Sequence, residues 1–419
     1  MTEKSNIPKN DTDDLSNRRG LAWVVVGIVM LTACMSMFPV YGSRIRELFS
    51  INAEQFAEMM GLNNIGRFAG LLAVGPLIAM VGARRVGEFS TLGIGGGFLI
   101  VGIGRSLQSL RIGMTVLGVF FGLFGVAIPA LLISLFPERK RGMFSVSLVA
   151  IALPGMLFPL LAGQLLKWSD QSEGRELSNS LFWPFLIAGS LLVIAALFLA
   201  VWKREAWSKP VEASVATPSL GNQLTGILRQ LSSLRSLLIV VLISLHGSAD
   251  NSVFTFLPMF MESHFDELPI STAWVISAHG LAYLITRGVL SLLPEGLGQR
   301  AILIFAGPLG GLIVIATLWY SPAIAIPVFY LLASLMFAAE FPTLASEVSS
   351  RSLGEFGSVL AAGLLISEVT TFALLKVTGR LADTTGDYRV ALSVAACGFI
   401  AFGCIALVTG IGRKDRPNN

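Results

Sequence analysis

The chain alternates between long apolar stretches and short polar segments. Twelve of the apolar stretches are close to the ~20 residues that a helix needs to cross a bilayer. Their approximate cores are residues 21–41, 56–80, 87–104, 112–135, 144–166, 182–201, 236–260, 272–293, 301–319, 323–346, 357–377 and 391–411. Backbone groups in lipid must find their hydrogen bonds within the protein, and stretches of this length do so as helices. The pattern therefore predicts an all-α membrane protein with twelve transmembrane helices.

Composition agrees with this prediction and excludes an ordinary soluble protein. Hydrophobic residues make up 54% of the chain and charged residues 13%, with a mean hydropathy of +0.74. Soluble domains have roughly 25% charged residues. The three cysteines, Cys34, Cys397 and Cys404, all lie inside predicted spans and have no metal-ligand spacing. The sequence also has no phosphate-binding glycine loop, HExxH or CxxC motif. We therefore expect no enzyme activity, no metal and no cofactor.

The distribution of basic residues predicts the orientation in the membrane. With an even number of spans and the N-terminus inside, the inner segments hold nineteen Lys and Arg and the outer segments nine. Inner segments of membrane proteins carry such an excess. We therefore expect a multi-pass protein of the cell (inner or plasma) membrane with both termini in the cytoplasm. The net charge of +4 then reflects topology, and no nucleic-acid partner is expected; the bilayer is the expected partner, and the protein is expected to be a monomer.

One long polar stretch divides the spans into six and six. This predicts a cytoplasmic tail at 1–19, a six-helix bundle at 20–202, a cytoplasmic central loop at 203–235, a second bundle at 236–412 and a tail at 413–419. Similar residues recur in the two halves at a common offset of 213: Gly75 and Gly288, Pro129 and Pro342, Ser145 and Ser358. A common offset in three helices indicates two parallel six-helix pseudo-repeats. Parallel repeats with a substrate site between them at mid-membrane are a transporter architecture.

The turn after the second span carries a motif that can be compared with a known family. The residues Gly75, Leu77, Gly82, Arg84 and Arg85 match a Gly-x-Leu…Gly-x-Arg pattern. With twelve spans, the duplication and the central loop, the chain resembles the major facilitator superfamily. Ala79 and Met80 depart from the motif, which has an acid and a base there. The resemblance implies a gate at this turn, formed by Gly75, Gly82, Arg84 and Arg85. It also implies a central cavity lined by helices 1, 2, 4, 5, 7, 8, 10 and 11.

Seven ionisable residues lie inside predicted spans, where a charge is costly and needs a partner or a water-filled cavity. They are Arg67, His246, Asp250, His279, Arg287, Glu340 and Glu368. All seven fall on helices that the resemblance assigns to the cavity. Arg287 adjoins the motif-like Gly288 near the predicted cytoplasmic end, and we interpret it as gate structure.

The remaining charged residues are candidates for binding and coupling. We expect the substrate to be bound by Arg67, Asn63, Asp250, Asn251, His279 and Glu340, and protons to be carried by Asp250, Glu340, Glu368 and His246. Arginine offers a planar fork to a carboxylate or phosphate, and histidine changes charge near neutral pH. The structural alternatives are a permanent pair between Arg67 and a buried acid, and neutral histidines that serve as helix contacts.

These features predict a secondary active transporter for a small polar, anionic organic solute, coupled to protons. Two other interpretations remain open at this point. One is an efflux antiporter for drugs or amphipathic cations, with the acids as counter-charges. The other is a membrane receptor or assembly scaffold that has the same fold and does not transport.

Overall fold

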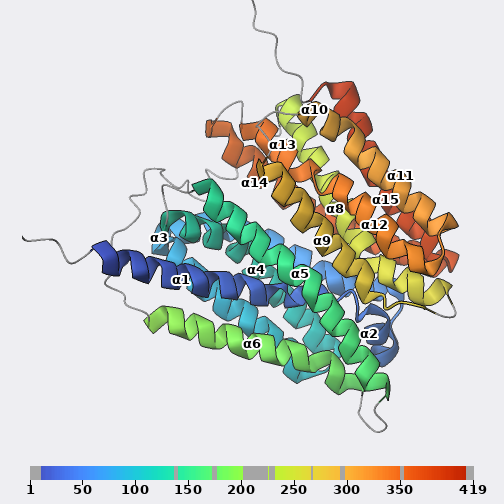
Figure 1. The fold of residues 1–419 in the computed structure, drawn as a ribbon, viewed down its shortest axis with the longest axis horizontal. Helices are drawn as coiled ribbons and strands as arrows, with labels where there is room; N and C mark the ends of the chain where they lie inside the picture. Colours follow the sequence, from blue (N-terminus) through green and yellow to red (C-terminus); the bar gives the residue numbers. More distant parts are fainter. Residues whose placement is uncertain are drawn as a thin grey trace, which may run out of the picture.

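The computed structural model describes residues 11–135, 140–171, 177–201, 225, 232–265, 268–292, 298–349 and 353–411. The first half of the chain forms α1 (Asp11–Thr32), η1 (Ala33–Met37), α2 (Gly42–Phe49), α3 (Ala53–Gly104), α4 (Leu107–Leu135), α5 (Lys140–Gln171) and α6 (Leu177–Val201). The second half forms α8 (Leu234–His264), α9 (Ala273–Leu292), α10 (Gln299–Ala301), η4 (Ile302–Ala306), α11 (Gly307–Tyr320), η5 (Ala323–Ala325), α12 (Ile326–Phe337), α13 (Glu340–Ser349), α14 (Leu353–Thr385) and α15 (Tyr388–Thr409). Figure 1 shows the two halves as adjacent helical bundles, blue to green and yellow to red.

The predicted number of membrane crossings agrees with these helices. Within the described ranges, eleven helical stretches are long and apolar enough to span a bilayer, and one of them is the 52-residue α3. A helix of that length would measure ~78 Å at 1.5 Å per residue, more than twice the ~30 Å hydrocarbon core. It is interrupted at Gly82, whose φ of 85° and ψ of 154° are not helical. We therefore count α3 as two crossings, which gives twelve.

Two predicted boundaries differ from the structure or lie outside it. The helix α1 begins at Asp11, inside the predicted tail 1–19. Most of the predicted central loop and the tail after residue 412 lie outside the described residues.

Glycines bring the backbones of the N-terminal half into direct contact. Gly66 and Gly70 of α3 face Gly118 and Gly122 of α4, so closely that a Cβ on Gly66 would lie 2.4 Å from the Thr115 carbonyl oxygen. Helices in lipid gain little from apolar contact alone and rely on such close packing. The Gly118/Gly122 spacing in the sequence predicts a close contact, and the structure identifies its partner as a matching pair on α3.

The C-terminal half contains interrupted helices at the level of its buried charges. α12 ends at Phe337, and α13 begins at Glu340 after a two-residue turn. Pro342 lies two residues further on, and a proline has no N–H that could form a hydrogen bond to the preceding turn. In the neighbouring span, η4 (Ile302–Ala306) is a π-helical turn that directly precedes Gly307. Such turns are frequent at functional sites. The break places the Glu340 side chain at a helix start in the bundle interior.

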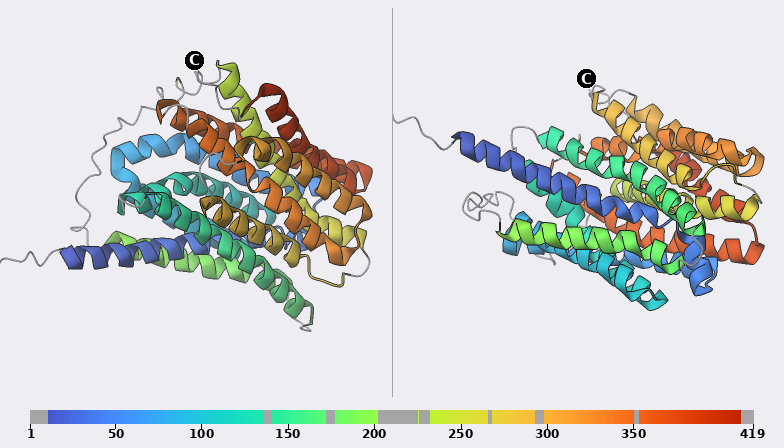
Figure 2. Two further views of the ribbon diagram at one scale, coloured as in Figure 1. Left: turned by 45° about the horizontal axis from the view of Figure 1, so that its top comes forward. Right: turned by 60° about the horizontal axis from the view of Figure 1, so that its bottom comes forward.

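The two halves are joined at the side of the molecule where α2 lies and α14 ends. The Asp383 carboxylate of α14 accepts hydrogen bonds from the backbone nitrogens of Ala53 and Glu54 at 3.0 and 2.7 Å, at the start of α3. Arg46 of α2 donates to the Tyr388 hydroxyl at the start of α15. We call this the loop side, and the opposite side, where α1 begins and α15 ends, the tail side (Figures 1 and 2). These contacts close the loop side.

Candidate functional site

A cavity of about 440 Å³ lies between the two halves. Its lining comes from α1 with η1, α3, α4 and α5 on one side and from α8, α9 and α14 on the other. The lining residues of α3 all precede the Gly82 break, and α6, α11 and α15 contribute no described lining residue. The lining thus uses seven of the eight helices that the resemblance implies. The exception is the tenth span, formed by η5, α12 and α13, which lies behind α9. Five of the expected site residues reach this cavity: Asn63, Arg67, Asp250, Asn251 and His279.

Arg67 and Glu368 form an ion pair across the interface between the halves. The Arg67 Nη2 atom on α3 lies 3.3 Å from Glu368 Oε1 on α14. The Glu368 side chain is buried at 8% exposure, whereas the arginine side chain is 41% exposed toward the cavity. The Arg67 Nε has no hydrogen-bond partner among the described residues. That nitrogen is buried, but the 41% exposure of the side chain leaves part of the guanidinium open to a ligand even when the pair is formed.

Asp250 belongs to a polar network on the C-terminal side of the cavity. Its Oδ2 accepts a hydrogen bond of 2.7 Å from the Tyr283 hydroxyl, and its Oδ1 lies 3.8 Å from His279 Nδ1. The same ring nitrogen is 3.3 Å from the Tyr330 hydroxyl and 3.4 Å from the Ser334 hydroxyl. The network therefore links the cavity wall of α8 and α9 to α12 behind it.

Arg287 also lines this cavity, one turn beyond Tyr283 on α9. Its guanidinium carbon lies 4.8 Å from the centre of the Tyr283 ring, a cation–π contact. Like Arg67, it has an Nε without a hydrogen-bond partner in the described part of the chain. The sequence suggested a gate role for this residue, and the structure places its side chain in the cavity wall.

His246 and Glu340 form a second pair, away from the cavity lining. The His246 Nδ1 atom lies 2.7 Å from Glu340 Oε2, with side-chain exposures of 8% and 0%. The rings of Phe399 and Phe402 flank the histidine. A Cβ on Gly307 would lie 2.2 Å from the Glu340 carboxylate, so a glycine is required there. The expectation that Glu340 contacts substrate has no support from its position in this conformation.

The contact between Tyr283 and Asp250 was missed from the sequence. Tyr283 lies four residues after His279 and four before Arg287, so the three share one face of α9; that spacing was the available signal. Asn251 was expected to bind substrate, but its side-chain amide donates to the Gly247 carbonyl at 2.8 Å within α8. Asn63 likewise donates to the Met114 carbonyl of α4 at 3.3 Å. Both side chains line the cavity, while the Asn251 amide donates within its own helix and the Asn63 amide donates to the neighbouring α4.

The comparison with protein families decides the identity of this fold. The family model of the Major Facilitator Superfamily matches residues 23–367. The chain belongs to the major facilitator superfamily. It is therefore a multi-pass membrane transporter and not an enzyme, as the sequence predicts. No curated protein matches the chain significantly in sequence.

Solved structures of major facilitator proteins share the fold at low sequence identity. A nucleoside transporter, NupG, has a TM-score of 0.72 at 12% identity, covering 94% of this chain and 99% of that one. A bacterial homologue of the human lysosomal transporter Spinster, inward-facing and occupied, has a TM-score of 0.67 at 13% identity, covering 94% and 96%. The E. coli fucose:proton symporter FucP has a TM-score of 0.63 at 14% identity, covering 95% and 99%. At these identities the likeness establishes the fold alone.

The turn that carries the Gly-x-Leu…Gly-x-Arg motif lies at the break in α3. Gly82 has the positive φ that favours glycine. Arg84 donates to Glu88 Oε1 at 2.6 Å and to the Leu199 carbonyl of α6 at 3.0 Å. These bonds hold the turn against α6, a helix of the same half of the protein. Gly75 lies on the same helix before the break and Arg85 follows Arg84 directly, while Ala79 leaves the position of the motif's acid without a charge.

Proposed function

We propose that this transporter moves a small polar organic anion by alternating access between its two halves. The observation that carries the proposal is the pair of arginines that line one cavity, Arg67 from the N-terminal half and Arg287 from the C-terminal half. A guanidinium binds a carboxylate or phosphate through parallel hydrogen bonds, and charge-assisted bonds of this kind are among the strong ones. An anion bound to both would connect the halves.

Proton coupling follows because the anion displaces Glu368 from Arg67. In this conformation Arg67 is paired with Glu368. A solute that takes over the guanidinium leaves a buried carboxylate without its cation, and a buried unpaired charge is strongly unfavourable. Proton uptake by Glu368 removes that charge. Anion binding and protonation of Glu368 therefore favour each other, and the solute and a proton travel together.

Asp250 and His279 complete the proposed solute site. The Asp250 carboxylate lines the cavity and can accept a hydrogen bond from a hydroxyl or amine of the solute, while Asn63 and Asn251 offer carbonyl oxygens. The buried pair of His246 and Glu340 has no direct path to the solute in this conformation. We assign it to a second titratable site that responds to movement of α13.

A second candidate function rests on the same Asp250. Phe121, Phe124 and Phe254 line the same cavity, and aromatic rings with one carboxylate also suit an amphipathic cation. Drug efflux is therefore the second candidate.

The proposed setting is the cell membrane, with both termini in the cytoplasm and the closed loop side outside. The protein would then be in its inward-facing state, and it is proposed to act as a monomer. Cysteines introduced as Ser214→Cys, outside the described residues, and Thr385→Cys should label from opposite membrane faces, Ser214→Cys from the cytoplasm. Labelling of both from one face would contradict the twelve-crossing orientation.

Flux measurements in proteoliposomes test the proposed function. A thermal-shift screen of the purified protein against carboxylates, phosphate esters, sugars and lipophilic cations, at two pH values, first selects the solute for radiolabelled uptake. We expect uptake driven by an inward proton gradient and inhibited by anions. Inhibition by lipophilic cations alone would support efflux of cations instead. A protein that binds solute but gives no flux or exchange would be a receptor.

A further inference from the structure

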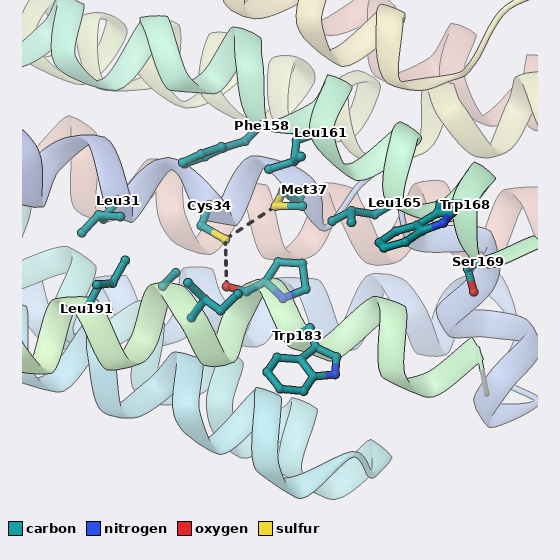
Figure 3. A pocket seen from close by; sticks show the side chains of 13 residues that line it. Leu31, Cys34, Met37, Phe158, Leu161, Leu165, Trp168, Ser169, Trp183 and Leu191 are labelled. Carbon is teal, nitrogen blue, oxygen red and sulfur yellow. Dashed lines mark hydrogen bonds between the residues drawn. The ribbon is translucent and has the colours of Figure 1, made fainter. Parts of the chain in front are cut away.

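A second cavity, of about 670 Å³, opens on the outer surface of the N-terminal bundle. It lies between α5 and α6, with α1 and η1 as its floor (Figure 3). In Figure 1, α1 lies between α5 and α6. We call this cavity the lateral crevice. Its lining is almost entirely apolar and includes Cys34, Leu161, Trp168, Trp183, Ile187 and Leu191.

The lateral crevice faces the hydrocarbon region of the bilayer. Leu161, Ile187 and Leu191 are 48%, 55% and 44% exposed although they are large apolar side chains. On a water-soluble protein this would be an exposed apolar patch, but on a membrane-spanning bundle it is in contact with lipid tails. The crevice is therefore continuous with the interior of the bilayer.

The length of the crevice matches one leaflet. From Trp183 to Leu191 along α6 is eight residues, or ~12 Å, and from Trp168 back to Phe158 along α5 is ten residues, or ~15 Å. Half of the ~30 Å hydrocarbon core is ~15 Å. Both tryptophans lie at the loop-side end (Figure 3) and are 59% and 55% exposed. Tryptophan at that level marks the membrane–water interface.

Little in the crevice would hold a polar ligand. The Cys34 Sγ is directed to the Met37 sulfur at 3.6 Å and to the Pro184 carbonyl at 3.9 Å, both weak contacts (Figure 3). An unfilled space of this size would forfeit the dispersion contacts of every side chain around it. The apolar material that reaches it from the bilayer is a lipid tail.

The floor of the crevice is also a wall of the solute cavity. In the five-residue η1, Cys34 and Met37 line the lateral crevice, while Ala33, Met35 and Ser36 line the central cavity. One short 3-10 turn therefore separates the two spaces.

We propose that the lateral crevice is a binding site for one acyl chain of a phospholipid from the loop-side leaflet. The headgroup lies beside Trp168, Ser169 and Trp183, and the tail runs along α5 and α6 toward Leu31 and Leu191. The chain completes the packing behind η1 and so supports the wall of the solute cavity.

Photolabelling in proteoliposomes tests this site without any transported solute. The probe is phosphatidylcholine with a diazirine midway along one acyl chain, and the adducts are mapped by peptide mass spectrometry. We expect adducts on residues 31–37 and 183–191 to exceed those on the lipid-facing part of α11, residues 309–319, roughly tenfold. An even distribution over the lipid-facing helices would overturn the proposal.

Variants of the lining separate a built site from general lipid contact. Ala188→Phe and Leu161→Trp each fill the crevice and should bring its labelling down to the level of α11. The matched control is Ile194→Phe, which changes an exposed residue of the same α6 outside the crevice, and it should leave the labelling unchanged. Enrichment that survives both filling variants contradicts the proposal.

Two other occupants would also be visible in this design. If a small aryl diazirine labels the crevice and the lipid probe does not, the occupant is a solute dissolved in the membrane. If a bifunctional reagent cross-links two copies of the chain through α6 and lipid labelling is absent there, the occupant is a second copy. Either result overturns the lipid proposal.

Discussion

The two halves of this transporter share one architecture and use it differently. The N-terminal half is packed backbone to backbone, with Gly66 and Gly70 against Gly118 and Gly122, and among the described residues Arg67 is its one charge in the membrane core. The C-terminal half carries two buried networks, one between His246 and Glu340 and one around Asp250, together with a broken tenth span. Close glycine packing leaves no room for rearrangement, whereas broken helices and titratable pairs can change state.

This difference suggests a division of labour between the halves. The N-terminal half acts as a rigid body that presents one anion-binding group, and the C-terminal half supplies the groups that respond to protons. Glu368 is the point at which they meet, since it belongs to α14 and is paired with Arg67 of α3. The predictions below test each half and then the contacts that join them.

The largest effect is expected from breaking the buried pair of the C-terminal half. Glu340→Ala leaves His246 without its partner in an enclosed site, and removing one member of a buried pair costs ~3–5 kcal/mol. The melting temperature in detergent should fall sharply. Glu340→Gln, which keeps the size and one hydrogen-bonding group, is the matched variant and should cost less. Equal melting temperatures for the two variants would show that the pair has no structural role.

The next largest effect is expected in the glycine contact of the N-terminal half. In Gly66→Ala the new Cβ would meet backbone atoms of α4 at less than 3 Å, and overpacking of this kind typically costs ~1–3 kcal/mol. Gly96→Ala is the control, because a Cβ there meets nothing within 4 Å. A thermal unfolding series should separate the two. If Gly66→Ala unfolds at the same temperature as Gly96→Ala, the N-terminal half is not as rigid as proposed.

A smaller effect is expected at the contact that joins the halves. The Asp383 carboxylate caps the start of α3, and loss of a cap costs ~0.5–2 kcal/mol. Because this cap bridges the halves, Asp383→Ala should shift the population toward the outward-open state. A cysteine introduced as Ser36→Cys in the cavity should then react faster with a reagent applied from the loop side. Thr384→Ala, at the neighbouring exposed position, serves as the control and should leave that rate unchanged.

The smallest effect is expected at Asp387, in the loop between α14 and α15. Its carboxylate accepts hydrogen bonds from the Arg389 side chain and backbone nitrogen, and the side-chain bond holds the pKa of Asp387 below its usual value. A lowered native pKa stabilises the fold above the unfolded pKa of ~3.9, and that contribution is lost as the pH falls through the native pKa. Asp387→Asn should therefore lower the melting temperature slightly at pH 7, because it removes a partly exposed ion pair worth ~0.2–1 kcal/mol. The difference in melting temperature between the variant and the wild type should vanish in acid. A difference that persists at pH 2 would contradict this assignment.

The sequence was sufficient for the fold but only partly for the site. Span length and composition predict twelve crossings because each helix must satisfy its own backbone in lipid. The cost of placing a charge inside the membrane in turn selects residues such as Arg67 and Asp250 as candidates for the site. It does not reveal which charges pair, because His246 and Glu340 are 94 residues apart and their contact depends on how the spans pack. For the same reason the sequence does not say which buried acid pairs with Arg67, and the structure identifies it as Glu368.

The cap at Asp383 could not be foreseen either. Residue 383 lies at the end of a span, where a carboxylate is ordinary, and its role arises only because the start of α3 comes next to it. Tyr283 was missed for a different reason, since a neutral residue gives no signal in a search for buried charge.

The central claim is that a bound anion takes Arg67 away from Glu368, which then binds a proton. Isothermal titration of the selected anion, in two buffers with different ionisation enthalpies, measures the protons taken up per anion bound. We predict close to one proton for the wild type at neutral pH and close to none for Glu368→Gln, with binding retained in that variant and lost in Arg67→Lys. Equal proton uptake by the wild type and Glu368→Gln would contradict the account, and so would unchanged affinity in Arg67→Lys.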